Sequence, residues 1–352
     1  MQIDDRAIPV DSLVVVVGAN GYMASESVEK LLQAGYRVRG TVRDLERHNG
    51  WMYRLFDSKW PGKFELVQVP DFLADAAFDE AFKGAAGAIY TSMPVILDTD
   101  IENVWGTSKN GLINTLEAAA RAGVQRYVLG SSSKAVITTN YTGSPVELTV
   151  DSYNYDSIKE VYSGPQEDSF ARRVATFSSG RALAELTFWD WVKKENPPFV
   201  ANCVVPDGQF GRILDVENMN VGDTSSSGQL KRALAGEWAG VPFSLAFISD
   251  VQDSARLLVA ALAKTSIKNE RIFSYYKNRT WNDLRQTIRQ EFPDRPELVK
   301  GPDSEITGRD VSFAPKPIAR AEEILRSIGQ SGFASEESIL RAFVASAYPV
   351  KQ

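Results

Sequence analysis

The glycine-containing run Gly18-Ala19-Asn20-Gly21-Tyr22-Met23 is the first stretch of the chain whose residue types suggest chemistry. It follows the apolar, mostly β-branched segment Leu13–Val17, which predicts a strand buried on both faces. It precedes residues 25–34, where apolar residues recur at helical spacing. Strand, glycine turn and helix form the phosphate cradle of a dinucleotide-binding unit, because glycine lets the backbone approach the pyrophosphate and the helix N-terminus offers it N–H groups. We therefore expect a dinucleotide to contact Gly18, Asn20, Gly21, Tyr22 and Met23.

Two arginines after the next strand indicate which dinucleotide is bound. The predicted strand Arg37–Val42 runs directly into Arg43, and Arg47 lies one turn further on. Many NAD-binding units place a carboxylate here for the ribose 2′-hydroxyl, whereas a guanidinium suits the 2′-phosphate of NADPH. In the alternative interpretation both arginines are solvated on a loop. After the third strand, Asp71 could bind the adenine amino group, and Phe72 could stack on the ring.

Composition excludes several classes of function. The net charge is −6 and no basic block occurs, which argues against a nucleic-acid partner. The single cysteine, Cys203, lies in an apolar run and is expected to be buried, so neither an internal disulfide nor a cysteine zinc site can form. The single histidine, His48, is predicted to lie solvated in a polar loop, which leaves no histidine-rich metal site and no Ser-His-Asp triad. We expect no bound metal.

The sequence also bears on location and partners. The first eleven residues are charged and lack the apolar core of a secretory signal, and no run of eighteen apolar residues occurs. We therefore expect a cytoplasmic protein, with no membrane partner, that acts on a small molecule as a monomer or homodimer.

Strands and helices alternate through the first 206 residues, a pattern typical of an α/β doubly wound parallel sheet. The predicted strands are Leu13–Val17, Arg37–Val42, Phe64–Val69, Ala86–Tyr90, Arg126–Leu129 and Phe199–Val205. The predicted helices cover residues 25–34, Phe78–Phe82, Val104–Ala122 and Val174–Lys194, with a polar segment from Tyr141 to Asp168. This pattern predicts a Rossmann domain over residues 1–206 that binds NADPH.

Beyond Pro206 the pattern changes to short amphipathic helices and one predicted strand, Arg271–Tyr275. Residues 222–228 form a flexible loop by composition. Because this half contains too few strands for a sheet of its own, we predict a smaller, mostly helical substrate lobe over residues 207–352, with residues 244–265 returning to the first domain. Such a lobe would close over the carboxyl ends of the strands, where open α/β sheets bind ligands.

Several motifs together resemble the extended (atypical) short-chain dehydrogenase/reductase superfamily, in particular the branch of dihydroflavonol reductases and fungal aldehyde and ketone reductases. The likeness runs over nearly the whole chain and is carried by residues 18–24, 40–43, 110–119, 128–132, 205–206 and 249–253. It implies further cofactor contacts at Thr91, Ser92, Ser131 and Pro206. It also implies a pocket bordered by Met93, Val95, Ser133, Tyr141, Gln209 and Phe210, whose character suggests a bulky, fairly hydrophobic substrate. Specialised (secondary) metabolism is the setting that the resemblance suggests.

The family reduces carbonyls with a serine and with a tyrosine and lysine spaced Tyr-x-x-x-Lys on a helix. By resemblance Ser132 takes the serine position, although Ser131 and Ser133 are its neighbours. The tyrosine position holds Phe177 and the lysine position holds Arg181. Phenylalanine has no proton to give, and arginine keeps its charge, so Arg181 can hold the nicotinamide ribose without relaying a proton. No Tyr-x-x-x-Lys occurs elsewhere in the chain.

Four interpretations follow from this departure. First, the protein transfers a hydride from NADPH to an acceptor that needs no tyrosine proton, such as an iminium carbon or an activated alkene. Second, another acid replaces the tyrosine, the candidates being Tyr141, Tyr153, Tyr155, Tyr162 and Asp207. Third, the site catalyses a redox-neutral cyclisation or isomerisation, with Ser132 or Arg181 polarising a carbonyl. Fourth, the protein is catalytically inactive and senses NADPH.

Overall fold

The computed structural model describes residues 1–164, 166–219 and 221–349. At its centre is a seven-stranded sheet whose strand order is β10-β7-β5-β4-β1-β2-β3. All of its pairings are parallel. The strands are β1 (Leu13–Val17), β2 (Arg37–Val42), β3 (Phe64–Gln68), β4 (Gly87–Tyr90), β5 (Arg126–Gly130), β7 (Val200–Pro206) and β10 (Arg271–Ser274). The predicted doubly wound Rossmann sheet is therefore confirmed.

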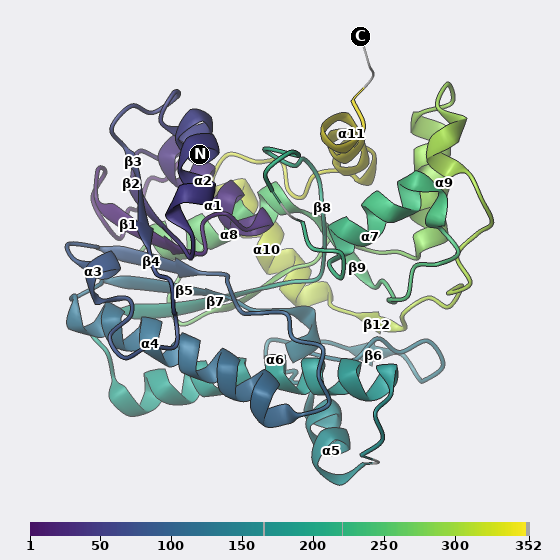
Figure 1. The fold of residues 1–352 in the computed structure, drawn as a ribbon, viewed down its shortest axis with the longest axis horizontal. Helices are drawn as coiled ribbons and strands as arrows, with labels where there is room; N and C mark the ends of the chain where they lie inside the picture. The colour runs from purple at the N-terminus through teal and green to yellow at the C-terminus, as the bar shows by residue number, and fades with distance from the viewer. Residues whose placement is uncertain (165, 220, 350–352) are drawn as a thin grey trace.

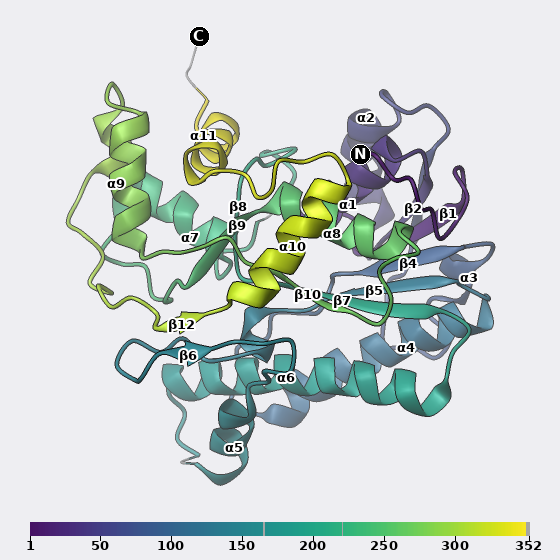
Figure 2. The ribbon, with the colours of Figure 1, turned by 180° about the vertical axis from the view of Figure 1, so that it is seen from behind.

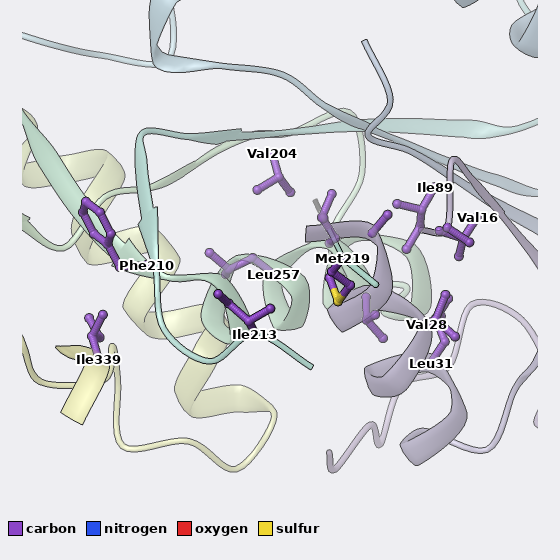
Figure 3. Packing of buried hydrophobic residues seen from close by; sticks show 14 of the residues in the cluster. Val16, Val28, Leu31, Ile89, Val204, Phe210, Ile213, Met219, Leu257 and Ile339 are labelled. Carbon is purple, nitrogen blue, oxygen red and sulfur yellow. The ribbon is translucent and has the colours of Figure 1, made fainter. Parts of the chain in front are cut away.

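Helices cover both faces of this sheet (Figures 1 and 2). Val14 and Val16 of β1 pack in one core cluster with α1 (Tyr22–Gln33), α2 (Leu45–Phe56) and α8 (Val251–Ala263). Val15 and Val17 pack in a second cluster with α4 (Thr107–Arg121) and α6 (Phe170–Glu195). Side chains of a strand alternate between its two faces, so the consecutive valines of β1 contribute side chains to both core clusters. Figure 3 shows part of the first cluster.

The order of the strands reverses between β1 and β4. β1 pairs with β2 on one side and with β4 on the other, and the chain reaches β4 only after β3. In open parallel sheets ligands bind at the carboxyl ends of the strands beside such a reversal. This edge carries the glycine turn after β1 and residues 91–97 after β4.

The second half of the chain contains more strand than we predicted. β8 (Gly208–Phe210), β9 (Phe247–Asp250) and β11 (Lys277–Asn278) form a three-stranded sheet, so the expectation of too few strands for a separate sheet is wrong. β10 adds to the large sheet by pairing with β7. The part of the second half that packs with the first domain therefore extends beyond the predicted residues 244–265. The predicted division into two domains at residue 206 stays a prediction.

The remaining elements surround these two sheets (Figure 1). Two lie where we predicted loop or polar segment, namely α2 and α5 (Tyr155–Ser163). The others are α3 (Asp79–Phe82), α7 (Ser226–Arg232), α9 (Trp281–Glu291), α10 (Pro315–Ser327), α11 (Glu336–Ala347), and the paired β6 (Val146–Glu147) and β12 (Ser312–Phe313). Short π-helical segments lie at Glu102–Gly106 and Ala233–Glu237, and single 3₁₀ turns at Ser133–Ala135 and Pro296–Val299. In the part of the chain that the structure describes, none of the helices is long and apolar enough to cross a membrane.

Candidate active site

The turn after β1 is held in a conformation that requires glycine. Gly18 has φ +69°, and its N–H donates to Thr41 Oγ1 at 3.0 Å. A Cβ on Gly18 would lie 1.7 Å from Ser92 Oγ. The Ser92 hydroxyl in turn donates to the carbonyl of Val17 at 2.5 Å. The segments after β1 and β4 therefore touch at the point where the strand order reverses. Gly18 and Ser92, both predicted to contact the cofactor, lie together there.

The N-terminus of α1 is open to an anion. Its N-cap residue is Gly21, and among the described residues no side chain caps it, so the first N–H groups of the helix keep their capacity to bind a pyrophosphate. Tyr22 starts the helix and donates its hydroxyl to the carbonyl of Gly211 at 2.9 Å. This contact ties the turn to the segment after β8. The residues present fit the phosphate groups of a dinucleotide.

Arg43 lies exposed at the end of β2, where a 2′-phosphate would be recognised. Its neighbour Asp44 is engaged elsewhere, because the carboxylate caps α2 by accepting the N–H of Arg47 at 3.0 Å. Within the described ranges the Arg43 guanidinium has no ion pair or hydrogen bond of its own. Asp44 is therefore a helix cap, and Arg43 is a free cation beside the glycine turn. The side chain of Arg47 is also exposed, one turn into α2.

His48 does not lie in a solvated polar loop, and that prediction is wrong. It is in α2 and only 9% exposed. Trp51 Nε1 donates to its Nδ1 at 3.2 Å, and its Nε2 lies 3.4 Å from Asn20 Nδ2 in the glycine turn. Burial, together with the charges of Arg47 and Arg43, lowers the pKa of His48. The imidazole is therefore neutral near pH 7 and supports the predicted cofactor contact Asn20.

The two residues predicted to hold adenine lie just after β3. The Asp71 carboxylate accepts the N–H of Leu73 at 2.9 Å, so a local turn fixes this exposed side chain. Phe72 is half-buried against α4, where a Cβ on Gly111 would come within 2.7 Å of its ring. Asn114 on the same helix donates to the carbonyl of Phe72 at 3.0 Å. The adenine contacts themselves stay predictions.

A pocket of about 340 Å³ lies at the carboxyl ends of β4, β5 and β7. Its apolar wall consists of Met93, Val95, Leu97, Val174, Phe177, Phe243, Leu245 and Trp281. Its polar lining residues are Thr91, Ser131, Ser132, Ser133, Lys134, Arg181, Asp207, Thr224, Ser225, Ser226, Gln229 and Ser244. Thr91 Oγ1 and Gln229 Oε1 are buried and have no hydrogen-bond partner among the described residues. Buried polar atoms are nearly always paired, so these two atoms point to a polar ligand.

Phe177 and Arg181 face this pocket from one side of α6, as their i, i+4 spacing requires. The Arg181 guanidinium lies 4.9 Å from the centre of the Phe177 ring. It donates to the carbonyls of Met93 and Pro94, both at 3.1 Å. Burial lowers the pKa of Arg181 to about 10, so it remains charged at neutral pH. In the ranges that the structure describes, Arg181 has no carboxylate partner and is an uncompensated cation in the pocket wall.

The carboxylate one turn further along α6 is already neutralised. Glu185 is fully buried, and Arg271 Nε donates to its Oε1 at 2.5 Å. The Ser131 hydroxyl donates to Glu185 Oε2 at 2.6 Å. Ser131 therefore binds α6 to the end of β5 although it borders the pocket. We did not predict a role for Glu185, but its spacing of four residues from Arg181 was a signal that could have suggested one.

The three consecutive serines differ in what their hydroxyl groups contact. Ser132 Oγ accepts the N–H of Lys134 at 3.2 Å, which leaves its proton available to a ligand. Ser133 instead donates to Asp207 Oδ1 at 2.7 Å. Asp207 Oδ2 accepts the N–H of Phe247 at 2.8 Å. Burial raises the pKa of Asp207, against the opposing effects of the Lys134 charge and these two hydrogen bonds.

Some predicted substrate contacts, and the predicted cofactor contact Pro206, lie outside the pocket lining. Phe210 is fully buried in the first core cluster (Figure 3), with its ring 6.0 Å from that of Trp281, so its prediction as a substrate contact is wrong. Gln209 donates to Ser249 Oγ at 2.7 Å, and Tyr141 packs on Gly308. Pro206 ends β7 inside the sheet. By contrast Thr91, Met93, Val95 and the three serines all line the pocket. Sequence reasoning missed the wall formed by Thr224, Ser225, Ser226 and Gln229.

Comparison with known proteins agrees with this geometry. A family model described as NAD(P)H-binding matches residues 18–166. Aldehyde reductase 2 of Sporidiobolus salmonicolor is 32% identical over 353 residues, which cover 98% of each chain. Ketoreductase adrE of Penicillium roqueforti is 34% identical over 98% of this chain and 99% of its own. The structure of Gre2 from Candida albicans in complex with NADPH has a TM-score of 0.79 at 22% identity and covers 96% of this chain and 98% of its own, which is a likeness of fold.

The fold and these relatives together define an oxidoreductase built on a Rossmann sheet that binds NAD(P)H. The chain belongs to the extended short-chain dehydrogenase/reductase family, and the resemblance found in its motifs is confirmed.

Proposed function

We propose that this protein is an NADPH-dependent reductase that transfers a hydride to a carbon acceptor without the family's tyrosine and lysine. The observation that carries the proposal is that Phe177 and Arg181 line a pocket together with Thr91 and Met93, the two neighbours of the Ser92 that contacts the dinucleotide turn. When bound, NADPH supplies the hydride. Arg43 recognises the 2′-phosphate as a free, exposed cation. Arg181 holds the nicotinamide ribose, and Ser132 donates to the acceptor.

The two walls of the pocket indicate an amphipathic substrate. The apolar wall around Phe177, Phe243 and Trp281 would cover a bulky hydrophobic body and exclude water. The polar lining residues Thr224 and Ser226 and the unpaired Gln229 Oε1 would bind hydroxyl or amine groups of the same molecule. Such a molecule is in keeping with specialised metabolism. Acceptors of three kinds fit the reaction: a carbonyl, an iminium carbon and an activated alkene.

Transfer of deuterium from labelled NADPH tests the proposal. The enzyme is incubated with NADPH deuterated at C4 and one bulky probe of each kind: phenanthrenequinone, a dihydroisoquinolinium salt and β-nitrostyrene. We expect one deuterium at the acceptor carbon of a product, detected by mass spectrometry, and no turnover when NADPH is omitted. Unlabelled product whose formation does not need NADPH would contradict the reductase and support a redox-neutral enzyme. Tight NADPH binding without any product would support a sensor.

A further inference from the structure

The loss of tyrosine at position 177 leaves the reduction of a carbonyl without its usual proton donor. The tyrosines that the sequence offered as replacements do not line the pocket. Tyr155 and Tyr162 are 59% and 54% exposed on α5. The ring of Tyr153 lies 4.0 Å from the Arg271 guanidinium, and Tyr141 packs on Gly308. Among the described residues, none of these four lines the pocket that contains Phe177.

Three side chains that carry a titratable proton line the same pocket, namely Lys134, Arg181 and Asp207. Arg181 keeps its proton at neutral pH, because burial lowers its pKa only to about 10. The Lys134 ammonium group donates to Thr139 Oγ1 at 3.0 Å. Asp207 differs from both, because a hydrogen bond joins its carboxyl to a hydroxyl that also borders the pocket, that of Ser133.

We propose that Asp207 and Ser133 form a proton relay that replaces the missing tyrosine, with Ser133 giving its proton to the substrate oxygen and Asp207 resupplying Ser133. The inference rests on the proposed reductase function and narrows its acceptor to a carbonyl. The 2.7 Å contact between Ser133 Oγ and Asp207 Oδ1 is a hydrogen bond that either oxygen can donate, depending on which of them carries the proton. With Asp207 protonated, Ser133 accepts from it and is free to donate its own proton into the pocket.

The step balances with NADPH as the reductant. The hydride forms a C–H bond at the carbonyl carbon, the C–O π bond breaks, and its electron pair goes to oxygen. That oxygen takes the proton of Ser133 Oγ, Ser133 takes the proton of Asp207 Oδ1, and the resulting carboxylate recovers a proton from solvent. The substrate gains two hydrogens and becomes an alcohol, and NADPH becomes NADP⁺.

Local surroundings favour the proton-bearing form of Asp207. Its carboxyl is packed between β7, β9 and the Ser133–Ala135 turn, and burial raises its pKa. The charged and titratable groups that face it are Lys134, which opposes this effect, and Asp310, which reinforces it, with Tyr141 and Tyr275 nearby. A carboxyl with a raised pKa keeps its proton to higher pH, so the relay should be active at low pH and lost as pH rises through that pKa.

The test compares Asp207→Asn with wild type, because asparagine keeps the size of the side chain and lacks the acidic proton. With phenanthrenequinone and deuterated NADPH, we expect kcat to fall about 10²–10⁴-fold, the range typical of losing a general acid. The fall in kcat with rising pH should disappear, whereas KM should change little. The kcat of Ser133→Ala should fall by a similar factor. The kcat of Ser133→Thr, which keeps the hydroxyl, should be close to that of wild type.

Two further variants serve as controls. Asp310→Asn removes another buried carboxylate that does not line the main pocket, and it should keep the fall in kcat with rising pH but shift it to lower pH, because the Asp310 charge helps to raise the pKa of Asp207. Lys134→Met tests the rival acid. If kcat still falls with rising pH in Asp207→Asn but no longer does so in Lys134→Met, the relay is overturned.

An infrared difference spectrum between wild type and Asp207→Asn gives a readout that needs no turnover. We expect a protonated-carboxyl band in wild type that disappears over the same pH range in which kcat falls, and an Asp207 that is ionised where the enzyme is fully active would overturn the relay. Deuterium transfer at equal rates in wild type and Asp207→Asn would also overturn it while leaving the reductase intact. No deuterium in any wild-type product would instead contradict the proposed function itself.

Discussion

The dinucleotide turn and the pocket face of α6 meet at one edge of the sheet, but they depart from the family pattern to very different degrees. The turn keeps its glycines, and Gly18 has a conformation and a contact with Ser92 that no larger residue fits. The α6 face keeps the i, i+4 geometry but carries Phe177 and Arg181 where the family has a proton donor and a lysine. The comparison teaches that binding of the cofactor and delivery of the proton are separable, because different elements provide them.

The largest effect should come from Gly18→Ala. A Cβ would lie 1.7 Å from Ser92 Oγ, and the residue has φ +69°. A left-handed conformation costs a non-glycine residue about 1–3 kcal/mol, and forced overpacking costs about as much again. We expect a loss of NADPH affinity of more than about 10²-fold, together with a lower melting temperature. Calorimetric titration with NADPH measures the affinity.

Gly50→Ala is the matched control for this variant. Gly50 lies in α2 and has open space beside it, since a Cβ there would meet nothing within 4 Å. Alanine favours a helix by about 1 kcal/mol over glycine, so this variant should be as stable as wild type or more so. Equal NADPH affinity in Gly18→Ala and wild type would contradict the described role of the turn.

The next largest effect is expected from changes on the pocket face of α6. The double variant Phe177→Tyr with Arg181→Lys restores the family's residues on a helix face that already points into the pocket. We expect a gain of up to about 10²-fold in kcat on simple aldehydes and ketones, the lower end of what one general acid contributes. Steady-state rates with NADPH measure it. No gain on any carbonyl would show that the pocket has diverged beyond these two positions.

A smaller effect is expected on the choice of cofactor. Arg43→Ala removes a cation that has no partner among the residues described. A hydrogen bond to a charged group contributes about 1.5–3 kcal/mol, so NADPH should bind about 10- to 100-fold more weakly while NADH binding is nearly unchanged. Fluorescence titration with both cofactors checks this. Equal weakening of the two would contradict recognition of the 2′-phosphate.

The smallest effect is expected for Asp44, the carboxylate that follows Arg43 in the chain. Asp44→Ala removes the cap of α2, whose hydrogen bond to the N–H of Arg47 is 3.0 Å. The loss of such a cap costs about 1 kcal/mol of stability. We expect a slightly lower free energy of unfolding in urea and no change in the ratio of NADPH to NADH affinity. A change in that ratio toward NADPH would show that Asp44 contacts the ribose.

The sequence predicted best those features that depend on neighbours in the chain. The valines of β1, the turn at Gly18 and the pair Phe177 and Arg181 follow from local pattern or from i, i+4 spacing. His48 was predicted wrongly, because its burial depends on Trp51 in a helix that we did not predict and on Asn20, 28 residues earlier. Phe210 was predicted wrongly as a substrate contact, because nothing in the residues around it indicates that Trp281 packs on its ring. The Ser133–Asp207 contact joins residues 74 positions apart, so only the fold could reveal it.

The central claim is that the proton donor has moved from position 177 to the Asp207–Ser133 pair, and a double-mutant cycle tests it most directly. kcat for phenanthrenequinone is measured for Asp207→Asn in two backgrounds, wild type and Phe177→Tyr with Arg181→Lys. We expect Asp207→Asn to cost about 10²–10⁴-fold in the first background and much less in the second, because the restored tyrosine supplies the proton. The same loss in both backgrounds would contradict the account.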